Sequence, residues 1–347
     1  MDGEEREPPR AAPPADPPAD AAQDDELVER VAAARDQLVA EIDRRIVGQR
    51  GVVEQLLVAM MAGGHALIVG VPGLAKTTMI QTLAGALSLH FGRIQFTPDL
   101  MPSDITGTDI LEEIEGSGRG FRFLPGPVFC NLLLADEVNR TPPKTQAALL
   151  QAMQERTVTA GGRSYPLERP FMVFATQNPI EQSGTYPLPE AQLDRFMLQV
   201  DVGYPSAEEE VEIVRRTTVG ELPEVRPLLE REQIVALQDL VPRVPAADHV
   251  LEYAVRLVRA SRPAEAGAPP DLRRYVSFGA GAPAAQMLLL APKAHTLLRG
   301  RGALDLGDVA ALAPAVLRHR LVLSFEAEAE GVRSDLLIRQ LIEETPR

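Results

Sequence analysis

The segment from Gly70 to Thr77 constrains the fold of this chain more than any other. It follows an apolar run at 66–69 that predicts a buried strand, and it precedes a run at 78–87 that predicts a helix. A glycine-containing loop with Lys-Thr between a strand and a helix is the layout of a phosphate-binding P-loop. The alternative is a chance glycine turn between the two elements. The loop and the residue after it read Gly70, Val71, Pro72, Gly73, Leu74, Ala75, Lys76, Thr77 and Thr78.

This loop predicts specific contacts with a bound phosphate. Its backbone N–H groups can surround an anion, and the N-terminus of the following helix adds a favourable partial charge. Lys76 is predicted to reach the β- and γ-phosphates, and the hydroxyl of Thr77 to hold Mg²⁺. The glycine that usually precedes the lysine is replaced by Ala75, so the loop departs from the general pattern at one position.

The composition limits the class of protein. A chain of 347 residues that is 45% hydrophobic is long enough for two domains with a sizeable core. The single cysteine, Cys130, excludes an internal disulfide framework and fits a reducing compartment. No apolar run approaches the length of a membrane span, and the acidic N-terminus lacks the apolar core of a signal peptide. We therefore expect a cytoplasmic protein without stable membrane insertion.

The charge argues against one class of partner. The net charge is −14, and half of it lies in residues 1–26, which hold nine carboxylates and two arginines. Broad binding to a nucleic-acid backbone needs clustered lysine and arginine, so we expect no nucleic-acid partner. A nucleic-acid motor is accordingly the least favoured of the functions considered.

The hydropathy pattern divides the chain into three parts. Residues 1–26 repeat Pro-Pro pairs among Ala and Asp and predict a disordered acidic tail. Residues 27–220 alternate helical patterns with short apolar runs, which predicts a parallel sheet between helices, that is, a doubly wound α/β domain. Residues 221–347 carry amphipathic helical patterns alone and predict a smaller all-helical domain. The runs that predict central strands are Ala66–Gly70, Leu132–Ala135 and Phe171–Ala175.

Two further segments carry residues suited to phosphoryl chemistry. Asp136 and Glu137 end an apolar run, which after a P-loop predicts that Asp136 holds Mg²⁺ and Glu137 polarises the attacking water. Two solvated carboxylates at a strand end are the alternative. Asn178 follows the next strand and is predicted to orient that water or contact the γ-phosphate, although Asn-Pro alone indicates only a turn.

Arg195 is the candidate for an arginine finger that enters a neighbouring subunit's nucleotide site. A planar, permanently charged guanidinium matches phosphoryl oxygens and stabilises charge in the transition state. The alternative is a salt bridge within the chain to Asp194 or Glu190.

These motifs, in this order, resemble those of an AAA+ ATPase, and their sequences are similar to those of the MoxR family. The resemblance covers roughly residues 27–335. The matching runs are 70–77, 94–104, 125–127, 134–140, 142–146, 175–181, 184–196, 317–320 and 326–331.

The resemblance implies several properties. Members bind ATP and Mg²⁺, form rings that are usually hexameric, carry a helical lid after the core, and remodel protein partners as chaperones do. They commonly work with proteins that contain a von Willebrand factor A domain. Backbone near Val47, Gly48 and Gln49 is implied to contact the adenine end. The family typically has two insertions, one between Thr97 and Phe123 and one that forms a hairpin at 157–167, where Gly-Gly indicates a two-residue turn.

One position departs from the family pattern. The arginine that would reach from the lid to the γ-phosphate falls on Pro283, which has no charge and no side-chain donor. Weak coupling between lid and phosphate is therefore expected. An alternative function follows, a nucleotide-gated assembly scaffold with little turnover, although the intact Glu137 and Arg195 favour hydrolysis.

Overall fold

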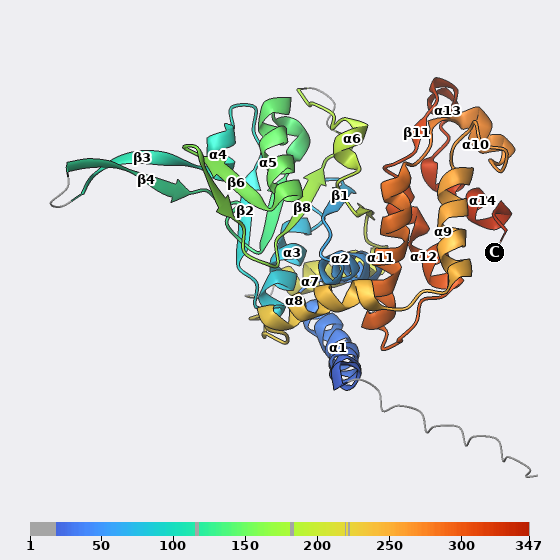
Figure 1. Ribbon diagram of the computed structural model, residues 1–347, viewed down its shortest axis with the longest axis horizontal. Coiled ribbons are helices and arrows are strands. Elements are labelled where there is room, and N and C mark those ends of the chain that lie inside the picture. The colour runs from blue at the N-terminus through green and yellow to red at the C-terminus, as the bar shows by residue number, and fades with distance from the viewer. Residues whose placement is uncertain (1–18, 115–117, 181–183, 219, 221–222, 347) are drawn as a thin grey trace, which may run out of the picture.

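The computed structural model describes residues 19–114, 118–180, 184–218, 220 and 223–346 (Figure 1). Helix α1 (Ala19–Asp43) begins inside the range expected to be a disordered tail, so residues 19–26 are helical. The remainder of that expected tail, residues 1–18, lies outside the described residues. None of the helices in the described part of the chain is both long enough and apolar enough to cross a bilayer.

A five-stranded parallel sheet forms the centre of the first domain (Figure 1). The three strands expected from apolar runs are its inner strands, in the order β5-β8-β1. The two outer strands lacked so clear a run, and the side chains of β2 in particular are mostly half-buried or exposed. In sheet order the strands are β2 (Phe91–Gln95), β5 (Leu132–Asp136), β8 (Met172–Gln177), β1 (Ala66–Gly70) and β9 (Leu198–Val202).

The sheet separates two hydrophobic cores, because successive side chains of a strand point to opposite faces. On β1, Ile68 belongs to the core that includes α2 (Arg50–Met61) and α3 (Lys76–Ala86). Its neighbour Leu67 belongs to the core that includes α5 (Pro143–Glu155). Helices therefore cover both faces, and the predicted α/β class is confirmed.

The second domain is helical except for a two-stranded antiparallel sheet. That sheet pairs β10 (Val276–Phe278) with β11 (Val322–Leu323), and strands of this length are too short to give a hydropathy signal. The expectation of an all-helical lid is corrected at this point. The lid helices are α8 (Arg231–Leu240), α9 (Asp248–Ala260), α10 (Pro270–Tyr275), α11 (Ala282–Leu298), α12 (Leu306–Leu317), α13 (Phe325–Glu330) and α14 (Ser334–Glu344).

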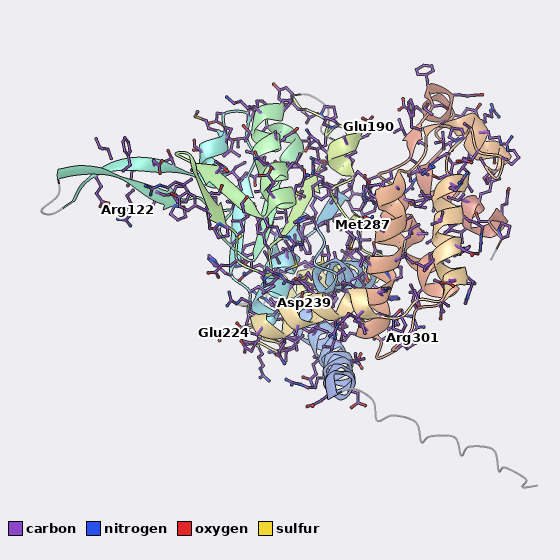
Figure 2. All side chains as sticks on the ribbon, in the orientation of Figure 1. Arg122, Glu190, Glu224, Asp239, Met287 and Arg301 are labelled. Carbon is purple, nitrogen blue, oxygen red and sulfur yellow. The ribbon has the colours of Figure 1, made fainter. Side chains whose placement is uncertain are left out.

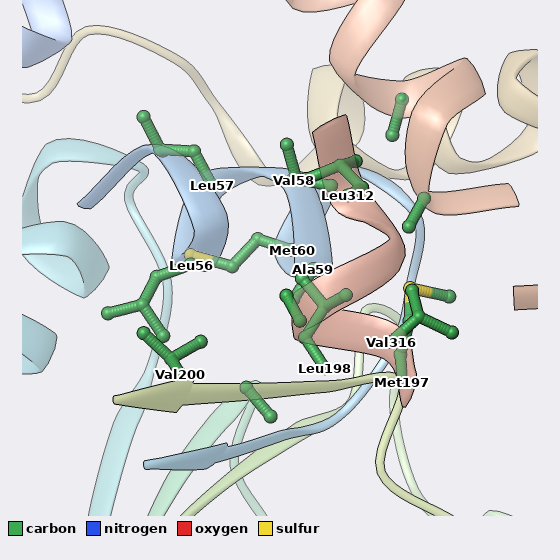
Figure 3. Close-up of a cluster of buried hydrophobic side chains, with 14 of the residues drawn as sticks. Leu56, Leu57, Val58, Ala59, Met60, Met197, Leu198, Val200, Leu312 and Val316 are labelled. Carbon is green, nitrogen blue, oxygen red and sulfur yellow. The ribbon is translucent and has the colours of Figure 1, made fainter. Parts of the chain in front are cut away.

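The lid packs directly on the core. Leu312 and Val316 of α12 lie beside Leu198 of β9 and side chains of α2, and all of them are buried (Figure 3). Helix α7 (Ala207–Thr217) is capped by Ser206, whose hydroxyl accepts the N–H of Glu209 in a capping box.

Two hairpins extend from the other side of the core. Strands β3 (Gly107–Ile114) and β4 (Gly118–Pro125) follow α4 (Pro102–Thr106) and form an arm that projects from the body, with Arg122 on it (Figures 1 and 2). Strands β6 (Thr157–Ala160) and β7 (Arg163–Pro166) are joined by Gly161-Gly162, both with positive φ as a two-residue turn requires. Phe123 of the arm stacks on Tyr165 of β7 with ring centroids 4.0 Å apart.

A buried histidine ties three elements of the core together. The Nδ1 atom of His65 accepts the N–H of Val173 at 2.9 Å, and its Nε2 donates to the carbonyl of Met153 at 3.3 Å. Burial lowers the pKa of His65 from 6.5 to about 4. The ring is therefore neutral in the folded protein at neutral pH.

We expect His65 to make the protein less stable in mild acid. Between pH 6.5 and 4 the unfolded chain binds a proton at His65 and the folded chain does not, so stability falls as pH falls through this window. The full pKa difference corresponds to about 3 kcal/mol at pH 4. Denaturant unfolding of His65→Gln should show a shallower pH dependence than the wild type, whereas the exposed His249→Gln should not. An unchanged slope in His65→Gln would contradict this assignment.

Candidate functional site

The loop between β1 and α3 has the backbone shape of an anion site. Gly73 has φ of 86° and Ala75 has φ of 52°, so successive N–H groups turn toward one concavity. Ala75 occupies the position where glycine is usual, and its left-handed conformation explains that preference, at a cost of roughly 1–2 kcal/mol for a residue with a Cβ. The sequence departure at Ala75 therefore leaves the shape of the loop intact.

Lys76 occupies the start of α3 with its ammonium turned back over the loop. Its Nζ donates to the carbonyl of Gly70. Burial lowers the pKa of Lys76, and the nearby carboxylates of Asp136 and Glu137 oppose that shift. The cation is thus held among groups that a bound phosphate would replace as partners.

A cavity of about 430 Å³ joins this loop to the carboxyl ends of three strands. It collects the predicted Lys76 and Thr77 from the start of α3, Asp136 and Glu137 from the end of β5, and Asn178, which follows β8. Parallel strands end at the same edge of a sheet, and the first turns after them form the ligand site there. The other lining residues are Pro72, Gly73, Leu74, Ala75, Thr78, Arg93, Gln95 and Thr176.

Asp136 and Glu137 are linked through one hydroxyl. Thr176 donates to Oδ1 of Asp136 at 2.7 Å and accepts the N–H of Glu137 at 2.8 Å. Glu137 has φ of 57°, a left-handed conformation that directs its chain away from the strand. This geometry is compatible with the roles predicted for Asp136 and Glu137. Asp136 and Thr77 are the candidates for holding Mg²⁺, because carboxylate and hydroxyl oxygens suit this ion.

The strand β2 supplies two residues that the sequence did not indicate. Arg93 donates to Oδ2 of Asp136 at 2.7 Å, and Gln95 donates to Oε2 of Glu137 at 2.9 Å. Gln95 lies in register with Asp136 on the neighbouring strand. The carboxylate of Glu137 is also paired with Arg140 at 3.1 Å. The polar ending of β2 could have suggested these residues, had its place beside β5 been known.

A smaller, mostly apolar cavity of about 160 Å³ adjoins the loop. Val47 and Gln49 line it, as expected for contacts at the adenine end, together with Leu74 from the loop. Gly48 lines a neighbouring hollow with both of them, and Val71 lines neither cavity. The sequence did not indicate the wall from α7, which consists of Ile213, Arg216 and Thr217.

The structure places the other predicted residues as follows. Asn178 lines the phosphate cavity, and its Oδ1 accepts the N–H of Ile180 at 3.1 Å. Arg195 is exposed after α6 (Glu190–Leu193), lines neither cavity of its own subunit, and donates to Gln154. Among the described residues Arg195 forms no ion pair with Asp194 or Glu190, and Asp194 pairs with Arg320 at 2.6 Å.

Pro283 lies in the first turn of α11. Both cavities are lined by residues of the core and of α7, and by none from the described lid residues 223–346. Pro283 itself therefore lines neither cavity.

We expect Lys76→Met to weaken binding of Mg-ATP by about 10- to 100-fold, the worth of a charge-assisted hydrogen bond. The substitution keeps the aliphatic stem and removes the cation that faces the phosphates. Isothermal titration would measure the change in Kd, with the exposed Lys144→Met as control. Equal affinity in Lys76→Met and the wild type would exclude this cavity as the phosphate site.

Comparison with known proteins identifies the family of the chain. Residues 65–198 match the model of the ATPase family associated with various cellular activities, and residues 272–341 match that of the AAA lid domain. Chaperone MoxR1 of Mycobacterium tuberculosis is 44% identical over 89% of this chain and 81% of its own length. Protein YeaC of Bacillus subtilis is 40% identical over 88% of this chain and 92% of its own.

A solved structure shares the whole architecture. A protein from Cytophaga hutchinsonii, described as a "putative ATPase", superposes with a TM-score of 0.87 at 38% identity, covering 94% of this chain and 98% of that one. The P-loop cavity, the core and lid, and these relatives lead to one conclusion: the chain belongs to the MoxR family of AAA+ ATPases.

Proposed function

We propose that this protein binds ATP with Mg²⁺ and hydrolyses it to ADP and phosphate. The observation that carries the proposal is the single cavity in which the P-loop meets Asp136, Glu137 and Asn178, with an apolar cavity beside it for a base. The two cavities share Gly73, Leu74, Ala75 and Thr78, so one molecule can occupy both.

Each residue has a role that its position supports. Loop N–H groups and Lys76 bind the β- and γ-phosphates. Thr77 and Asp136 would hold Mg²⁺, which would neutralise part of the phosphate charge. Glu137 polarises the attacking water, and Gln95 and Arg140, which both contact its Oε2, hold the carboxylate in place. Asn178 orients that water or contacts the γ-phosphate.

Arg195 acts in trans, on the nucleotide of the next subunit. Its exposure outside both cavities of its own subunit supports this role, since an arginine finger has to reach a neighbour. A head-to-tail interface that closes on itself produces a ring, and we propose a hexamer. ATP turnover then depends on assembly.

We further propose that the ring remodels protein partners in the cytoplasm. The relative MoxR1 of Mycobacterium tuberculosis is named a chaperone, which supports this class of work. A protein with a von Willebrand factor A domain is the partner proposed from the family resemblance. The exposed apolar side chains of the β3–β4 arm, including Leu111 and Phe121, are available for protein contacts.

Steady-state ATP hydrolysis by the assembled protein tests the proposal against the scaffold alternative. We expect turnover that needs Mg²⁺, that Glu137→Gln abolishes, and that Pro283→Arg changes only modestly. ATP bound without turnover above the Glu137→Gln background, with activity gained in Pro283→Arg, would instead establish the nucleotide-gated scaffold.

A further inference from the structure

A buried arginine of the lid holds the chain on both sides of Arg195. Arg320 follows α12, and its side chain is 2% exposed. Its Nε donates to the carboxylate of Asp194 at 2.6 Å. Its Nη2 donates to the backbone carbonyls of Asp194 at 3.2 Å and Phe196 at 2.8 Å, the two residues that flank Arg195. One guanidinium thus contacts three acceptors on Asp194 and Phe196. We call residues 194–197 the finger segment.

Neighbouring groups strengthen this attachment. A third nitrogen of Arg320, Nη1, donates to the carbonyl of Met197 at 3.3 Å and also to that of Val316 on α12. Nε2 of His319 lies 3.0 Å from the carbonyl of Phe196. The lid therefore contacts the backbone of the finger segment through donors that are themselves anchored to the end of α12.

The adjacent arginine of the lid provides a contrast. Arg318 also bridges lid and core, and its side chain is 13% exposed. It contacts the carbonyl of Gln199 at 3.2 Å and the carboxylate of Asp201 at 3.3 Å, both on β9, and Asp335 of the lid at 3.1 Å. None of these acceptors belongs to the finger segment. The two arginines thus attach the same turn to different parts of the core.

Stability alone does not account for the Arg320 contacts. Burial lowers the pKa of the Arg320 guanidinium, which shows the cost of keeping that charge inside, and Asp194 opposes the shift. Apolar residues at a buried ion pair are often as stabilising as the pair. A planar group with several fixed donors instead specifies where its acceptors lie.

We infer that Arg320 is a positioning residue for the arginine finger, which links the lid of one subunit to hydrolysis in the next. This inference rests on the proposed trans role of Arg195. Because Asp194 and Phe196 are fixed by the lid, a movement of α12 relative to the core moves the backbone from which Arg195 extends. The lid then acts on the neighbouring nucleotide site without lining the cavities of its own subunit.

The test uses mixed assemblies of two inactive variants. Subunits with Arg195→Ala keep a complete site and lack the finger, whereas subunits with Glu137→Gln keep the finger and lack the water-activating carboxylate. Mixing them is expected to restore ATP hydrolysis at Arg195→Ala sites that face a Glu137→Gln neighbour. Absence of restoration in this first mixture would overturn the proposed trans finger, and the inference with it.

The second mixture examines Arg320 itself. Adding Arg320→Met to the Glu137→Gln subunit is expected to lower the restored rate by about 10-fold or more, because misplacement of a reacting group by about 1 Å can cost 100-fold. That subunit's own site is already inactive, so a purely local effect of Arg320 would leave the restored rate unchanged. Restoration equal to that of the first mixture would overturn the inference while leaving the trans finger in place.

Two further variants separate positioning from folding. Arg318→Met in the same Glu137→Gln subunit removes the other lid–core arginine and should restore hydrolysis as fully as Glu137→Gln alone. Arg320→Lys keeps the charge beside Asp194 but not the planar fork, so it should also restore poorly. Native mass spectrometry would confirm that each subunit enters the mixed assemblies, and equal loss in the Arg318 and Arg320 variants would indicate a general structural role, against the inference.

Discussion

Arg195→Ala is expected to lower the kcat of ATP hydrolysis by about 1000-fold, because an arginine finger is worth roughly 10³ to 10⁵ in phosphoryl transfer. The guanidinium stabilises the negative charge that develops on the transferring phosphoryl group. We propose no other described residue for this role. Since Arg195 lines neither cavity of its own subunit, the Kd for ATP should change little.

Turnover and binding measured on the same preparation test this expectation. Arg169→Ala is the matched control, because Arg169 is also an exposed arginine, and within the described part of the chain its side chain forms a surface ion pair with Asp239 at 2.7 Å. It should retain turnover close to that of the wild type. A kcat for Arg195→Ala within a few-fold of the control would show that Arg195 is not a finger, and its contact with Gln154 would then be structural.

Glu137→Gln is expected to lower kcat by about 100- to 10,000-fold, the usual contribution of a positioned general base. The amide has the same shape but cannot accept the proton of the attacking water. ATP binding should be retained, because the loop and Lys76 are unchanged. The variant should therefore hold ATP without consuming it, which quench-flow and nucleotide retention would measure.

The contacts of Glu137 sharpen this prediction. Gln95 and Arg140 both contact Oε2 of its carboxylate, and the Gln side chain of the variant can keep the contact with Arg140 through its amide oxygen. Glu168→Gln is a suitable control, because Glu168 is an exposed carboxylate whose partner is Arg231 on the surface. Residual turnover of Glu137→Gln near that of this control would assign water activation to another group.

The central strands and the P-loop could be predicted because their signals are local. Three inner strands are buried on both faces, so each reads as a continuous apolar run, and the loop residues are consecutive. The same holds for the β6–β7 hairpin, whose turn needs two residues with positive φ. Strand β2 has an exposed outer edge and lacks such a run, and for that reason its contributions to the site were missed.

The residues of the candidate site also divide into those that the sequence indicated and those that only the structure revealed. Lys76, Thr77, Asp136, Glu137 and Asn178 follow recognisable strand ends, and the structure brings all five into one cavity. The wall formed by Ile213 and Arg216 could not be inferred, because nothing in the sequence of α7 records which loop it faces. The beginning of α1 at Ala19 was also missed, since its first residues belong to a segment whose composition favours disorder.

The sequence alone determined the fold class, the phosphate-binding loop and the identity of the main catalytic candidates, because these depend on residues close together in the chain. The tertiary structure decided which residues far apart in the chain come into contact. Arg93 meets Asp136 because β2 lies beside β5, and Arg320 meets Asp194, 126 residues earlier, because the lid packs against the core at β9. Strand order and domain placement come from the packing of the whole molecule, and no local spacing in the chain specifies them.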